Sequence, residues 1–78
     1  MYSYHISKQM GSSYILIWPY ASFGYYCTDF DEAKEQFKLQ TEDQPDASFK
    51  LVSYPAVVHD SMVVGITGSS VVIDTHNV

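Results

Sequence analysis

The sequence predicts a single α+β domain covering residues 1–78, in which a mainly antiparallel sheet of about five to six strands carries one amphipathic helix on one face. Three observations lead to this prediction. Short runs with the patterns of strands fill the first and last thirds of the chain. One stretch between them, at about residues 29–41, has helical periodicity. A length of 78 residues leaves room for one small core.

The first third of the chain has the pattern of a β-meander. Residues 2–9 alternate between two faces, and Ser3 and His5 fall on the more polar face, which is typical of a half-buried strand. After a turn around a glycine, residues 14–18 are apolar on both faces. Such a run suits either a central strand covered on both sides or a strand that meets a partner. Residues 23–27 are expected to form a third, shorter strand.

A helix is expected to follow. Thr28 or Asp29 can serve as its N-cap, and carboxylates crowd its first turn, where the helix dipole favours them. The apolar stripe of this helix consists of Phe30, Ala33 and Phe37. The expected ion pairs along the helix are Asp31 with Lys34 and Glu35 with Lys38.

The last third of the chain is again rich in strand patterns. Residues 48–54 predict a strand that Pro55 caps or kinks at an edge of the sheet. Residues 62–67 and 70–75 flank Gly68-Ser69, a pattern that predicts a β-hairpin. The residues between Pro55 and this hairpin fit a loop, a helical turn or a short strand.

The charged residues exclude two classes of function. The chain has nine acids and four lysines but no arginine, and its net charge is −5. Direct DNA or RNA binding is not expected, because it depends on Lys and Arg that neutralise phosphates. Phosphoryl transfer, which uses cationic clamps, is disfavoured for the same reason.

The sequence has no signal-peptide pattern and no apolar run as long as a membrane span, so a cytoplasmic location is expected.

Few residues suggest catalysis or metal binding. Cys27 precedes the expected helix, where a thiol can be activated, but a nucleophile also needs a histidine beside it. The three histidines, His5, His59 and His76, lack metal-binding spacing, and Cys27 has no CxxC partner. We therefore expect Cys27 to be a buried structural residue, and we expect no catalytic residue, no metal and no cofactor.

The acidic residues are concentrated in one segment. Seven of the nine acids lie between residues 29 and 46, and this segment carries the whole net charge of −5. Several of these acids fall on the helix opposite its apolar stripe. Leu39 falls among them and marks either an earlier helix end or an exposed apolar anchor. The predicted partner-binding residues are Asp31, Glu32, Glu35, Leu39, Glu42 and Asp43.

This acidic surface has two interpretations. It is either a solvated face that keeps a small protein soluble, or a docking surface for a larger protein or complex with a basic surface. In its size, its acidity and its lack of motifs, the chain resembles small phage- or mobile-element-encoded proteins that block host machinery, such as anti-CRISPR and anti-restriction proteins. The resemblance implies a non-enzymatic inhibitor in the host cytoplasm that binds the nucleic-acid-binding surface of its partner.

Self-association is the alternative function. In this interpretation the apolar run Ile15–Trp18, or a strand near the C-terminus, pairs with a second copy of the chain to form a homodimer or a larger assembly. The acids would then only confer solubility. A cysteine-dependent enzyme that uses Cys27 and one histidine is the least favoured interpretation.

Overall fold

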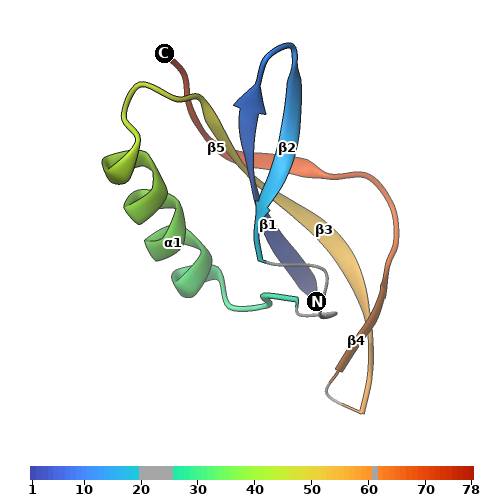
Figure 1. Ribbon diagram of the computed structural model, residues 1–78. Coiled ribbons are helices and arrows are strands. Elements are labelled where there is room, and N and C mark those ends of the chain that lie inside the picture. Colours follow the sequence, from blue (N-terminus) through green and yellow to red (C-terminus); the bar gives the residue numbers. More distant parts are fainter. Residues whose placement is uncertain (20–25, 61) are drawn as a thin grey trace.

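A long strand, β3, organises the sheet. The computed structural model describes residues 1–19, 26–60 and 62–78. Its elements are β1 (Tyr2–Met10), β2 (Ser13–Trp18), α1 (Phe30–Asp43), β3 (Phe49–His59), β4 (Met62–Ile66) and β5 (Val71–His76). The pairs that these strands form are all antiparallel. The predicted fold class, an antiparallel sheet with one helix on one face, is therefore confirmed (Figure 1).

The sheet is centred on β1 and β3. β1 pairs with β2 on one side and with β3 on the other. The second side of β3 pairs with two strands in turn. These are β5, which pairs with Phe49 to Ser53, and β4, which pairs with Ala56 to His59. β4 and β5 therefore follow each other along one edge of the sheet, and β2 forms the opposite edge (Figure 1).

The predicted hairpin around Gly68 and Ser69 is wrong. β4 and β5 each pair with β3 and do not pair with each other. Gly68, with a φ of 76°, lies in the connection that leads from one strand to the other. Turn residues specify only a local bend. The backbone groups of β3 on the side away from β1 need partners, and both β4 and β5 supply them.

Pro55 lies inside β3 and does not end it, contrary to the prediction. The Ala56 N–H donates to the Met1 carbonyl at 2.9 Å, on the β1 side of the strand. Because successive amides of a strand point to opposite sides, the nitrogen of Pro55 faces the other side, between the ends of β4 and β5. A proline is tolerated here because the neighbouring edge is interrupted.

β2 is not the covered central strand that was one of the two expectations. No described residue pairs with its outer side. Its last two residues, Ile17 and Trp18, pack against the core, whereas residues 14–16 are exposed. The other expectation, a strand that meets a partner, stays open.

The expected third strand, at residues 23–27, lies largely outside the described residues. Within them, Cys27 forms an isolated bridge with Tyr4, whose N–H donates to the Cys27 carbonyl at 2.8 Å. This contact holds the segment that precedes α1 against β1.

α1 begins and ends close to the predicted bounds of about residues 29–41. Asp29, and not Thr28, is the N-cap, since its Oδ1 accepts the N–H groups of Asp31 at 2.9 Å and Glu32 at 3.3 Å. These bonds satisfy two of the amides that a helix start leaves without partners. The ring of Phe30 is partly exposed and packs against Tyr4, with the ring centroids 5.5 Å apart.

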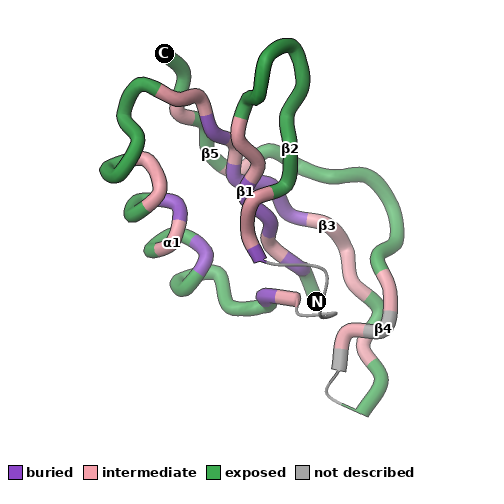
Figure 2. The backbone as a smooth tube through the Cα atoms, viewed as in Figure 1, coloured by how far each residue is buried: buried purple, intermediate pink, exposed green. Residues whose placement is uncertain are grey.

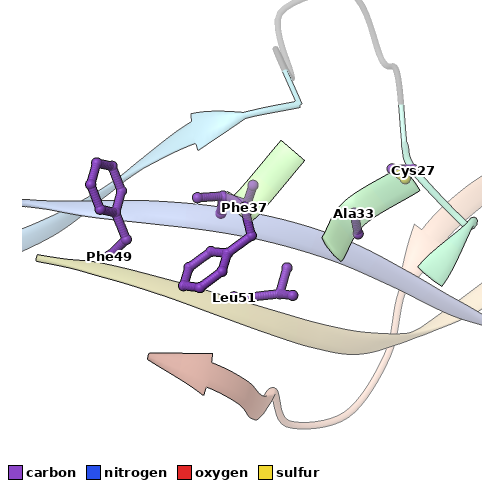
Figure 3. Packing of buried hydrophobic residues seen from close by; sticks show 6 residues of the cluster. Cys27, Ala33, Phe37, Phe49 and Leu51 are labelled. Carbon is purple, nitrogen blue, oxygen red and sulfur yellow. The ribbon is translucent and has the colours of Figure 1, made fainter. Parts of the chain in front are cut away.

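The hydrophobic core lies between α1 and the middle of the sheet (Figure 3). Ala33 and Phe37 point from the helix toward β1 and β3, where Phe49 and Leu51 are fully buried. Burying side chains of this size contributes about 1.5–3 kcal/mol each. The hairpin of β1 and β2 extends beyond the helix, so its far end is exposed (Figure 2).

Candidate functional site

The predicted acidic residues lie on the exposed side of α1. The helix continues through Leu39 to Asp43, which excludes an earlier helix end as the explanation for this leucine. The side chain of Leu39 is 48% exposed. All six predicted partner-binding residues are exposed, namely Asp31, Glu32, Glu35, Leu39, Glu42 and Asp43.

Helical geometry places several of these residues around Leu39. Glu35 precedes it by four positions, and Glu42 and Asp43 follow it by three and four positions, so all three are its neighbours on the helix surface. Glu32 lies two turns before Leu39 on the same side. We call these five residues the Leu39 face.

The lysines of the helix lie on another side of it. A groove of about 570 Å³ separates α1 from β5, and both Lys34 and Lys38 line it together with Asp31 and Glu35. The Leu39 face therefore excludes the lysines, although its Glu35 also borders this groove. The remaining residues that line the groove are Phe37, Thr41, Asp74, Thr75 and His76.

The predicted ion pairs along the helix are not formed. Lys34 places its Nζ 5.5 Å from the centroid of the Phe30 ring, a cation–π contact. Among the described residues, none forms a salt bridge with Asp31 or Glu35. Exposed pairs at this spacing contribute only a few tenths of a kcal/mol, which does not compensate for ordering two long side chains.

The sequence did not predict the burial of Ser3 and His5. Both residues lie on the far face of the sheet, which we define as the face away from α1, and Ser3 is fully buried. The Ser3 Oγ and the His5 Nε2 are hydrogen-bonded at 2.9 Å, and the rings of His5 and Tyr54 are perpendicular, with their centroids 5.1 Å apart. Burial lowers the pKa of His5. Alternation in the sequence assigns residues to a face, but it carries no signal of how deeply the curled sheet buries that face.

The Ser3–His5 pair resembles the nucleophile and base of a hydrolase only in its hydrogen bond. A nucleophile must be reached by substrate, and the Ser3 hydroxyl is fully buried. The pair instead gives each of two buried polar side chains a partner, which offsets the cost of removing them from water.

A shallow groove of about 370 Å³ lies beside this pair on the far face. Its lining joins β1, β2, β3 and β4. Lys50 belongs to the same face and places its Nζ 4.0 Å from the centroid of the Tyr14 ring. The lining consists of His5, Ser7, Tyr14, Leu16, Val52, Tyr54 and Ile66.

Cys27 is buried in the core. Its Sγ donates to the Asp29 carbonyl at 3.3 Å. Burial raises the pKa of the thiol, and the nearby carboxylates of Glu32 and Asp29 raise it further. Within the described part of the chain, no histidine is hydrogen-bonded to Cys27. These contacts favour the neutral thiol, which is neither a good nucleophile nor a metal ligand.

The described residues contain neither a metal-binding cluster nor a membrane-spanning helix. No group of three or more His, Cys, Asp and Glu side chains in residues 1–19, 26–60 and 62–78 could hold a metal ion. The helix among these residues is too short and too polar to span a membrane. Comparisons with protein-family models, with curated proteins and with solved structures find no match to this chain.

Proposed function

We propose that this chain is a non-enzymatic protein-binding module whose Leu39 face engages a basic surface on a larger protein. The observation that carries the proposal is the exposure of Leu39 among carboxylates. A single exposed leucine is common on protein surfaces. An apolar side chain with charged neighbours on one side of a helix, however, has the composition of an interface centre with a polar rim.

The charges of this face support the proposal. Glu35, Glu42 and Asp43 form no salt bridge with any described residue, so their charge is available to a partner. A negative surface speeds encounter with a basic one, and salt weakens this effect because the Debye length is about 8 Å at physiological ionic strength. Binding by this face is therefore expected to weaken as salt is added.

The proposed partner is a protein whose basic surface ordinarily binds nucleic acid. Acidic residues one turn apart on a helix have Cβ atoms about 5–6 Å from each other, and their carboxylates present a row of negative charge to Lys and Arg side chains that otherwise contact phosphates. An inhibitor of host defence, of the anti-CRISPR or anti-restriction type, would act in this way. In this proposal the chain occupies the surface and excludes the nucleic acid.

The test first identifies a partner and then measures its affinity. The immobilised chain captures proteins from a host lysate, mass spectrometry identifies the basic proteins among them, and the dissociation constant of each purified candidate is then measured at several salt concentrations. The double variant Glu35→Gln, Glu42→Gln should raise the dissociation constant about tenfold or more and reduce its salt dependence. Leu39→Ala should raise it by a similar factor without changing the salt dependence.

A matched control removes two acids elsewhere. Asp46→Asn with Asp60→Asn changes the net charge by the same amount, and both residues are exposed and lie off the Leu39 face. Asn also tolerates the positive φ of 52° at Asp60. Equal losses of affinity in the two double variants, or full affinity after Leu39→Ala, would contradict the proposal.

A further inference from the structure

The outer edge of β2 is an unprotected strand edge. No described residue pairs with it, and the six residues of β2 include no charged side chain and no proline. Ile15 is 50% exposed and Leu16 is 41% exposed. Proteins usually blunt such an edge with charges, proline or a cover, because an exposed apolar edge accepts another strand.

The opposite edge of the sheet has the protective features that β2 lacks. On β5, the Asp74 carboxylate accepts the N–H of Thr75 at 2.8 Å, so this amide is already engaged. Asp74 also places a charge on the strand, beside the groove that Lys34 and Lys38 line. The edge is further interrupted at Gly68, between β4 and β5. These differences favour β2 as the edge that takes a further strand.

We infer that β2 pairs in antiparallel orientation with β2 of a second copy of the chain, which joins the two sheets into one. A second copy fits this edge because β2 is uncharged, so an antiparallel copy of it places no like charges opposite each other. The two copies are related by a two-fold axis perpendicular to the sheet, which keeps the two helices on the same side.

The register of this pair follows from the β1–β2 hairpin. Met10 pairs with Ser13 across a two-residue turn, so the backbone groups of Ser13 and Ile15 face β1 and those of Tyr14 and Leu16 face the free edge. Residues opposite each other must also share a face. Both conditions are met when Ile15 lies on the two-fold axis and Tyr14 bonds to Leu16 of the second copy.

The charge of the protein does not oppose this pairing. The acids are concentrated on α1, whose main contacts with the sheet are to β1 and β3. With strands spaced about 4.8 Å apart, the two helices of the pair are separated by roughly 20 Å. This distance is more than twice the Debye length of about 8 Å at physiological salt, so the helices repel each other only weakly.

The assembly is expected to stop at two copies and to be weak. A pair that uses the same edge of both copies is closed, and the edges that remain are the interrupted edges at β4 and β5. One six-residue edge buries less than the roughly 1,200 Å² of a standard interface. We therefore expect a dissociation constant in the micromolar range or weaker. In the pair, Tyr14 and Leu16 bring the far-face grooves of the two copies side by side.

The test is sedimentation equilibrium of the full chain from about 10 µM to 1 mM at physiological salt, a range chosen for a weak complex. The weight-average mass of the wild-type chain should rise toward that of a dimer. Ile15→Lys should give a monomer throughout. Val72→Lys is the matched control, because Val72 is also 50% exposed but lies on β5, and it should leave the dimer intact. Both substitutions change the net charge of the chain by the same amount, so loss of the dimer in Ile15→Lys alone results from the lysine placed on the β2 edge and not from the net charge.

A covalent trap tests the register even if Ile15→Lys does not fold. Non-hydrogen-bonded partners in antiparallel strands have Cα atoms about 4.5 Å apart, within the range of a disulfide. Ile15→Cys should therefore form a disulfide-linked dimer under mild oxidation, whereas the wild-type chain, whose Cys27 is buried, should not. A wild-type chain that stays monomeric at every concentration would overturn the inference. Equal disruption by Ile15→Lys and Val72→Lys would also overturn it. Leu39→Ala should still dimerise, which separates this inference from the proposed function.

Discussion

The helix-covered part of the sheet and the end of the β1–β2 hairpin have similarly apolar sequences but opposite exposure. Phe49 and Leu51 on β3 are fully buried beneath α1, whereas residues 14–16 on β2 are exposed. Helix position causes the difference, since α1 packs over β1 and β3. An apolar run in the sequence therefore predicts a strand but does not predict which layer covers it. Covered residues determine stability, and uncovered ones are available for recognition.

Truncating one residue in each region should have very different effects on the free energy of unfolding. Phe49→Ala should lower the free energy of unfolding by about 3–5 kcal/mol, because it leaves a cavity under the helix. Leu16→Ala should lower it by less than about 1 kcal/mol, because that side chain is exposed. Urea unfolding of both variants, followed by circular dichroism, measures the two values. Similar decreases in the free energy of unfolding of the two variants would contradict the difference in burial between the two regions.

A second comparison concerns two glycines on the β4–β5 side of the sheet. Gly68 has a φ of 76°, and a Cβ there would lie 3.4 Å from Cγ of Pro55, so Gly68→Ala should cost about 1–2 kcal/mol. Gly65 lies within β4, and a Cβ there would meet nothing within 4 Å. Gly65→Ala should therefore leave the urea midpoint unchanged or raise it. Equal decreases in the free energy of unfolding of both variants would contradict a requirement for glycine at position 68.

The stability of α1, the helix that covers the sheet, depends on its N-cap, Asp29. Asp29→Ala removes the acceptor for two helix amides and should cost about 1 kcal/mol. Asp43→Ala removes the same charge at the other end of the helix, where a carboxylate opposes the dipole, and should be neutral or slightly stabilising. Thermal unfolding of the two variants measures this difference. A smaller melting-temperature loss for Asp29→Ala than for Asp43→Ala would contradict the capping role.

The most gradual effect concerns the far face, which is buried at His5 although α1, the helix among the described residues, lies on the other face of the sheet. Burial lowers the pKa of His5 in the folded protein below its usual value of about 6.5, so the unfolded chain binds a proton first as the pH falls. This contribution to stability is full above about pH 6.5 and decreases toward the folded pKa, with a slope of at most about 1.4 kcal/mol per pH unit. Urea midpoints between pH 7 and 5 measure it.

Two variants test whether His5, and not another titrating group, causes the pH dependence of stability. His5→Gln keeps a side chain that can hydrogen-bond to Ser3 but does not titrate, so its stability should fall less on acidification than that of the wild type. His59→Gln, which removes a histidine whose side chain is 78% exposed, is the matched control. Parallel curves for His5→Gln and the wild type would show that His5 is not the source.

The sequence predicted the features that depend on neighbouring residues. The capping acid Asp29, the apolar stripe on α1 and the turn at Gly11 all follow from local geometry, and the structure contains each of them. The exposure of Leu39 was one of two predicted alternatives, and the length of α1 decides between them. Five of the six predicted partner-binding residues make up the Leu39 face, because helical periodicity places them without knowledge of the rest of the fold. Asp31 instead lines the groove with Lys34 and Lys38.

The sequence did not predict the features that depend on distant residues. Gly68 has the signal of a hairpin turn, but β4 and β5 pair with a third strand. Pro55 is compatible with a central strand because a gap between two other strands lies beside it, and no local pattern encodes such a gap. The same limit applies to Ser3 and His5, since the burial of a sheet face depends on how the whole sheet curls.

The pairing of β1 with both a near and a distant strand has a consequence for the order of folding during synthesis. β2 follows β1 directly, so the β1–β2 hairpin can form as soon as it leaves the ribosome. β3 is made only after α1, and until then the side of β1 that will pair with β3 is open. A nascent chain therefore presents a hairpin with two free edges while translation continues at about 5–20 residues per second. Contact with a chaperone is most useful in this interval, before Met1 bonds to Ala56 and the sheet closes.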